Sequence, residues 1–117
     1  MQITQNQNAI RIWKNLELNI IYAGHAIVGQ DWKEPKVCSP FSRIYYIVDG
    51  EGILTVNGQR IVLKKGSVWL VPAGMTFGYF CESSMEQLFF HLNVLCRDGT
   101  DLLYGVRQLY ERKEQTG

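Results

Sequence analysis

Seven side chains in the middle and late parts of the chain could together form a small-molecule site. They combine one guanidinium, one imidazole and one amide with two phenols and two phenyl rings, which offer hydrogen-bond donors, acceptors and stacking faces. These residues are Arg43, Tyr45, Phe77, Tyr79, Gln87, Phe89 and His91. Such a set suits a small polar ligand, and we predict a sugar or an organic acid.

Arg43 narrows this prediction, because a buried guanidinium without a partner is costly. It implies an anionic or hydroxyl-rich ligand, or an acid inside the protein. The other interpretation is a surface arginine paired with Asp49, Glu51 or Glu86. His91 also has a second interpretation, as a partly buried histidine whose hydrogen bonds are satisfied within the protein.

The reactive residue types do not assemble into a recognisable catalytic group. Cys38, Cys81 or Cys96 would need a nearby base to act as a nucleophile, and only His25 and His91 are available. No carboxylates are paired at fixed spacing on one strand, and no serine lies in a nucleophile-elbow context. We therefore predict a binding role without catalytic residues, so that the chain is not an enzyme.

The elements that would position these side chains are short strands between turn residues, a pattern typical of an all-β sandwich or barrel. Asn57 and Gly58 separate two alternating apolar segments, and an Asn-Gly pair favours the type I′ turn of a hairpin. This turn pairs position 56 with 59, 54 with 61 and 53 with 62. Strands are predicted at 16–23, 26–28, 41–48, 52–56, 59–63, 67–71, 76–81 and 86–95, with a loop at 31–35.

The hydrophobic period changes after residue 98. Apolar residues then recur with helical spacing at positions 102, 103, 106, 109 and 110. Thr100 is a suitable N-cap, and Asp101 suits the positive end of a helix dipole. The pattern predicts an amphipathic C-terminal helix.

One stretch resembles the second conserved motif of cupin β-barrels, Gly-x5-Pro-x-Gly-x2-His. Gly66, Pro72 and Gly74 have its spacing, and Phe77 stands in place of its histidine. The resemblance implies a cupin-like β-barrel, which is also described as a double-stranded β-helix or jelly roll.

The first cupin motif, Gly-x5-His-x-His-x3,4-Glu-x6-Gly, would end at Gly50. Counting back places Arg43 at its glutamate, and positions 37 and 39, or 36 and 38, at its two histidines. Under either count no ligand of the motif is kept, whereas a zinc, iron or manganese site needs several convergent ligands. The resemblance therefore implies a barrel that binds no metal and no other cofactor.

The ligand positions of a cupin face the interior of the barrel, and strand alternation extends this face. It places Tyr45 beside Arg43, and Tyr79 beside Phe77, although Phe77 could simply fill the core. On the strand at 86–95, the mixed face is assigned to the site and the apolar face to packing between sheets. The mixed face holds Gln87, Phe89, His91 and Asn93, and the apolar face holds Leu88, Phe90, Leu92 and Val94.

A narrower resemblance covers residues 16–96. Segments 41–52, 63–66, 71–74 and 88–94 are similar to the effector-sensing domain of AraC-type bacterial transcriptional regulators. The resemblance implies an N-terminal arm at 1–15, an effector-binding barrel at 16–97, and a helix with the start of a linker at 98–117. It also implies a small-molecule effector, a homodimer, and DNA contact only through a domain missing from this chain. The alternatives are a metal-independent cupin isomerase or epimerase, and a stand-alone small-molecule-binding cupin.

Length and charge limit the remaining possibilities. The chain has 117 residues, enough for one domain, and a net charge of +1 gives no electrostatic footprint for nucleic acid. No apolar segment approaches membrane-spanning length, so no membrane partner is expected. Three cysteines without C-x-x-C spacing predict reduced thiols and a cytoplasmic protein.

Overall fold

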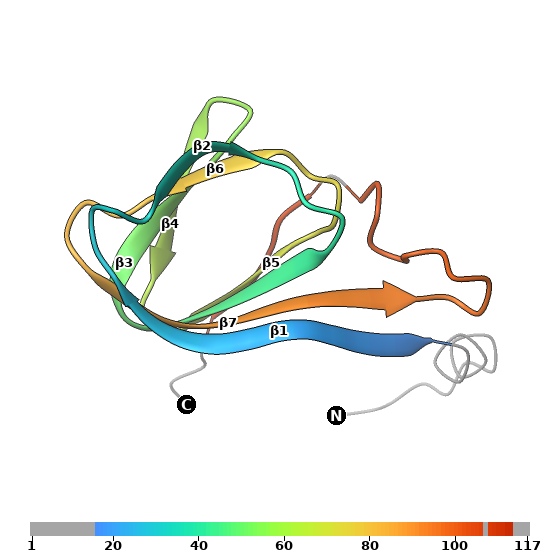
Figure 1. The fold of residues 1–117 in the computed structure, drawn as a ribbon. Coiled ribbons are helices and arrows are strands. Elements are labelled where there is room, and N and C mark those ends of the chain that lie inside the picture. The colour runs from blue at the N-terminus through green and yellow to red at the C-terminus, as the bar shows by residue number, and fades with distance from the viewer. Residues whose placement is uncertain (1–15, 107, 114–117) are drawn as a thin grey trace, which may run out of the picture.

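The computed structural model of the protein describes residues 16–106 and 108–113. Within these residues the chain forms eight strands and no helix, so the all-β prediction is confirmed (Figure 1). The strands are β1 (Glu17–Val28), β2 (Lys33–Val37), β3 (Ser42–Val56), β4 (Gln59–Lys64), β5 (Ser67–Val71), β6 (Phe77–Phe80), β7 (Met85–Leu95) and β8 (Tyr110–Lys113). None of the described elements is a helix that could span a membrane.

Strand β3 is shared by both walls of the barrel. Its first half pairs with β7 on one side and β5 on the other, giving the order β1-β7-β3-β5-β8. Its second half pairs with β4 and β6, and β6 also pairs with β2. All of these pairs are antiparallel, and the strands close around a common interior (Figure 1). This is the arrangement that a cupin-like jelly roll predicts.

The turn between β3 and β4 has the predicted conformation and register. Asn57 and Gly58 both have positive φ, at 51° and 78°, as a type I′ turn requires. Val56 faces Gln59, and Leu54 faces Ile61, as the two-residue loop predicts. Leu54 is fully buried as a result, so the hairpin delivers its apolar face to the core.

The strands differ from the prediction mainly in length. The two strands expected at 16–23 and 26–28 are one strand, β1, with an irregularity between Ile20 and Tyr22. The strands expected at 41–48 and 52–56 are likewise joined in β3. β2 begins at Lys33, inside the expected loop. In each case hydrogen bonds to a neighbouring strand continue through residues whose local propensity favours a turn.

The predicted C-terminal helix is not found in the described part of residues 98–117. Leu102 and Val106 lie in a succession of turns, and Gly105 has a φ of +90°, which interrupts a helix. Strand β8 then pairs with β5. The apolar residues with helical spacing do not share one buried face, since Leu102 and Tyr110 are each 46% exposed whereas Leu109 packs against the core. The open edge of β5 supplies hydrogen bonds instead. The predicted arm at residues 1–15 lies outside the described residues.

Gly50 allows β3 to turn from one wall to the other. Its φ is +72°, and a Cβ there would collide with the carbonyl oxygen of Ser84. Gly58, in the hairpin turn, has a similar φ of +78° but no neighbouring atom within 4 Å of that position. A side chain at position 58 would therefore cause backbone strain alone, whereas one at position 50 would cause both backbone strain and a steric clash.

We expect Gly58→Ala to lower the free energy of unfolding by about 1 kcal/mol, the cost of a left-handed alanine. Gly50→Ala adds the collision with the backbone of Ser84 and should cost roughly 3 kcal/mol or more. Urea denaturation followed by circular dichroism measures both values. Equal losses in the two variants would show that Gly50 is not sterically required.

Candidate functional site

One wall of the barrel interior is built from three rows of residues that face each other across β1, β7 and β3. Each row takes one residue from each strand, because the three strands pair in register. The rows are Tyr22–His91–Arg43, Gly24–Phe89–Tyr45 and Ala26–Gln87–Ile47. Alternate residues of a strand point to the same side, so these rows share one face.

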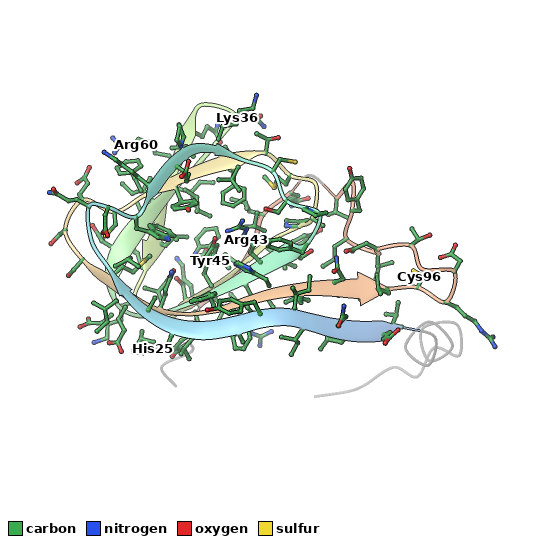
Figure 2. All side chains as sticks on the ribbon, in the orientation of Figure 1. His25, Lys36, Arg43, Tyr45, Arg60 and Cys96 are labelled. Atoms are coloured by element: carbon green, nitrogen blue, oxygen red, sulfur yellow. The ribbon has the colours of Figure 1, made fainter. Side chains whose placement is uncertain are left out.

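A cavity of about 330 Å³ lies over these rows, at the lower end of the size range of small-molecule sites. Six of the seven predicted site residues line it, namely Arg43, Tyr45, Tyr79, Gln87, Phe89 and His91. The other lining residues are Tyr22, Ala26, Val28 and Trp32. Arg43 and Tyr45 point into this interior, whereas His25, Lys36 and Arg60 point away from it (Figure 2).

Phe77 is the predicted site residue that does not line the cavity. It is 3% exposed and belongs to the hydrophobic core, with its ring near that of Tyr79. The inward face of β6 was correctly assigned, but an apolar ring at this position packs against the core. Phe77 thus lies behind the cavity wall, where its ring is 5.5 Å from Cζ of Arg43.

Arg43 is held in the cavity wall, and no carboxylate of the described residues pairs with it. Its Nη2 donates to Ser39 Oγ at 2.9 Å, and its Nη1 lies 3.4 Å from the Tyr45 hydroxyl. The rings of Phe41 and Phe77 lie 5.2 and 5.5 Å from its Cζ, within reach of a cation–π contact. Its Nε is buried and has no hydrogen-bond acceptor among the described residues.

The acids that could have paired with Arg43 at the surface are engaged elsewhere or do not reach it. Glu86 lies 2.7 Å from His25, and Asp49 lies 3.9 Å from Lys65. No described carboxylate, Glu51 included, forms a salt bridge with Arg43. The interpretation of Arg43 as a cation of the cavity is therefore the one that fits the geometry.

His91 lies in the same row as Arg43 and among aromatic rings. Its imidazole stacks on Phe41 with ring centroids 4.6 Å apart, and the rings of Phe89 and Tyr22 lie at 5.6 and 6.1 Å. Burial lowers the pKa of His91 below its usual value, and the charge of Arg43 lowers it further. The imidazole is thus neutral near pH 7 and offers one donor and one acceptor.

Two phenols complete the polar lining, and both stay protonated. Burial raises the pKa of Tyr45 above its usual value, with Arg43 acting in the opposite direction. Burial also raises the pKa of Tyr79. Trp32 holds the two rings in place, with its centroid 4.2 Å from Tyr79 and in an edge contact at 6.2 Å with Tyr45.

Gln87 lies at the opposite end of the cavity from Arg43. Its side chain is 3% exposed, and its Oε1 has no hydrogen-bond partner among the described residues. The mixed face of β7 therefore faces the cavity as predicted, while Leu88 on the other face is 37% exposed. Asn93, at the end of that mixed face, instead donates to the carbonyl of Pro40 and to Asp101.

Trp32 and Tyr22 were not among the predicted site residues. Trp32 precedes β2 in a segment expected to be a loop, so strand alternation could not orient it. The irregularity in β1 next to Tyr22 changes which residues face inward. In the sequence, the only feature that could have identified these two residues as part of the site was their aromatic side chain.

The side chains at the cupin ligand positions do not fit a metal. Arg43 and Ser39 are hydrogen-bonded to each other, and Phe77 is buried in the core. Val37 is apolar, and the described residues contain no group of three or more His, Cys, Asp or Glu side chains that could hold a metal ion. A cation fixed to the chain, the Arg43 guanidinium, stands at one of these positions.

Comparisons with known proteins agree with this architecture. A family model described as "Cupin domain" matches residues 28–92. A search of curated protein sequences gives no significant match. The narrower similarity to AraC-type regulators stays a prediction, as do the homodimer, the DNA contact and the cytoplasmic location.

Solved structures resemble the chain in fold. The EutQ protein of Clostridium difficile aligns with a TM-score of 0.54 at 11% identity, over 71% of this chain and 69% of that chain. A predicted oxalate decarboxylase from Thermotoga maritima aligns with a TM-score of 0.53 at 18% identity, over 75% and 74%. A mutant salicylate 1,2-dioxygenase from Pseudoaminobacter salicylatoxidans gives 0.53 at 15% identity, over 84% of this chain and 27% of that chain.

These structures overturn the prediction that the chain is not an enzyme. Two of them are described as a decarboxylase and a dioxygenase, so this fold is used for catalysis. The prediction relied on catalytic groups being recognisable as local motifs, whereas in this fold a site is assembled from several strands. At 18% and 15% identity these similarities show the fold alone and assign no reaction to this chain.

The electrostatic coupling of Arg43 and His91 can be measured directly. We expect Arg43→Gln to raise the pKa of His91 toward its usual value, because one of the two causes of its depression is removed. NMR titration of the imidazole protons measures this shift. The matched control is Arg60→Gln, because Arg60 is exposed, lies outside the cavity and pairs with Glu82, and it should leave the pKa of His91 unchanged. An unchanged pKa of His91 in Arg43→Gln would mean that the guanidinium does not act on it.

Proposed function

The chain belongs to the cupin domain family, and within it we propose that this protein binds a small organic acid in the barrel through Arg43. The observation that carries the proposal is the guanidinium in the cavity wall, whose Nε has no acceptor and which has no carboxylate partner among the described residues. Leaving such a cation unpaired in a partly desolvated site is unfavourable, and a bound carboxylate would relieve the cost.

The rest of the lining supports an anion as the ligand. The ten lining residues include one cation and no acid. A carboxylate accepts two parallel hydrogen bonds from a guanidinium, and Tyr45 and His91 could donate to it from the adjacent positions. The aromatic rings around them lower the local polarity, which strengthens these interactions.

The sequence similarity to AraC-type sensor domains gives this binding a role. In that role the acid is an effector, captured in the barrel of a cytoplasmic homodimer that contacts DNA through another domain. Capture changes activity only if the acid binds two states of the protein with unequal affinity. The alternative role is that of a small-molecule-binding cupin without such a partner domain.

A second candidate function is metal-independent acid–base catalysis in the same cavity. The observation that favours it is that a neutral imidazole, His91, lines the same cavity as two protonated phenols, Tyr45 and Tyr79. Groups whose pKa values are shifted in opposite directions can serve as base and acid. The expected isomerase pair of a histidine with a carboxylate has no counterpart here, since the lining residues include no acid.

Deuterium exchange tests this second function. Carboxylic acids incubated with the protein in D₂O should exchange the hydrogen on the carbon next to the carboxylate, and His91→Gln should stop the exchange. His25→Gln removes the other histidine, which is 52% exposed and lies outside the cavity, and should exchange normally. Exchange that persists in His91→Gln would exclude His91 as the base.

The binding proposal predicts that acids bind and that neutral sugars do not. A thermal-shift screen of sugars, uronic acids and small carboxylates should find stabilisation only with the charged compounds. Arg43→Ala should weaken the best hit by on the order of 2 kcal/mol, about 30-fold in Kd by calorimetry, through lost charge-assisted hydrogen bonds. The matched control is Arg60→Ala, because Arg60 is exposed and pairs with Glu82 on the outside.

Two results would contradict the proposal. One is a neutral sugar that binds as tightly as the corresponding uronic acid. The other is an acid whose affinity is the same for wild type and Arg43→Ala, because the arginine would then be structural.

A further inference from the structure

We propose that the ligand is a flat aromatic acid that carries a hydrogen-bond donor at the end opposite its carboxylate, such as a para-hydroxylated aromatic carboxylate. The inference rests on the proposed function, in which Arg43 holds the carboxylate. It adds Gln87 as a specificity-determining residue, and it places the ligand between Arg43 and Gln87.

The three rows of the cavity wall place the two polar ends apart. Arg43 lies in the first row and Gln87 in the third, and four residues along a strand span about 13 Å. The guanidinium leans toward the second row, since its Nη1 lies 3.4 Å from the Tyr45 hydroxyl. The carboxylate and the hydrogen-bond donor of the ligand must therefore lie on opposite sides of one aromatic ring, rather than on neighbouring carbons of that ring.

The middle row offers a flat apolar surface for that ring. Phe89 lies over Gly24 of the neighbouring strand, where a Cβ would be only 2.6 Å from the end of its ring. Tyr45 lies across from Phe89, and Trp32 meets Tyr45 edge-on. Aromatic rings stack and meet edge-to-face with such neighbours, whereas a sugar would leave its hydroxyls facing them unpaired.

Gln87 supplies an acceptor that nothing in the described protein satisfies. Its side chain is 3% exposed, and its Oε1 is buried without a partner. Its cross-strand neighbours Ala26 and Ile47 have no polar side-chain atoms. Because a buried amide oxygen without a partner is unfavourable, a ligand hydroxyl that reaches it should gain affinity.

Four related acids test the proposal on the wild-type protein. Calorimetry should show that 4-hydroxybenzoate binds about tenfold more tightly than benzoate, through one hydrogen bond to a buried acceptor. Both 4-methoxybenzoate, which has no donor, and 2-hydroxybenzoate, whose donor is next to the carboxylate, should show no such gain. Equal binding of benzoate and 4-hydroxybenzoate would overturn the proposal, and so would an equal gain with 2-hydroxybenzoate.

A substitution of Gln87 tests whether this residue causes the preference for 4-hydroxybenzoate over benzoate. Gln87→Leu should lower the affinity for 4-hydroxybenzoate about tenfold, to the level of benzoate in wild type. Gln59→Leu is the matched control, because Gln59 is exposed on β4, and it should keep the preference. A preference that survives in folded Gln87→Leu would overturn the role of Gln87.

The series separates failure of this inference from failure of the proposed function. If benzoate binds and is lost in Arg43→Ala, but hydroxylation has no effect, the acid site stands and the ligand class is wrong. If none of the four acids binds but another carboxylate binds wild type and not Arg43→Ala, the acid site stands and only this inference fails. If no carboxylate of the thermal-shift screen binds, or if Arg43→Ala binds the acids as wild type does, the proposed function fails and this inference fails with it.

Discussion

Both walls of the barrel depend on the backbone of a single strand. β3 contributes its first half to the sheet with β7 and β5 and its second half to the pairs with β4 and β6. The change of direction occurs at Gly50, where β7 passes too close for a side chain. The register of β3 against β7 fixes which residues meet in each row, and therefore fixes the cavity. The pairing of β3 with its neighbours therefore positions the side chains of the site. These side chains also help to build the core, since Tyr45 belongs to it and Tyr79 and Phe89 pack against it.

The electrostatics of the cavity follow from its composition rather than from any single contact. One permanent cation lies among aromatic rings, with neutral His91 and the protonated Tyr45 and Tyr79 around it. Burial shifts the pKa of each of these three groups in the direction that favours its uncharged form. Arg43 cannot respond in this way, because a guanidinium does not lose its proton in a protein. The lining of the cavity thus carries a fixed positive charge and no negative charge, and an anionic ligand would neutralise it.

The sequence predicts local geometry well where one residue pair determines it. The Asn57-Gly58 turn fixed the hairpin register, and strand alternation placed Arg43, Tyr45 and Gln87 on the cavity face. The sequence could not reveal which strand edges remain open. Residues 98–117 contain a helical pattern, yet β8 forms because β5 has a free edge that only the folded sheet provides. Trp32 was missed for a similar reason, since its position depends on packing against Tyr79 rather than on strand periodicity.

The contact between Phe89 and Gly24 shows how the size of the cavity can change over evolution. Phe89 occupies the space that a side chain at position 24 would need. A single methyl group on the edge strand β1 would push the ring toward the ligand from behind, without altering any residue that lines the site. Relatives of this protein could therefore differ in the width of the molecules they accept while sharing every lining side chain. Comparisons based on contact residues alone would group such relatives together, and the glycine would be the position that separates them.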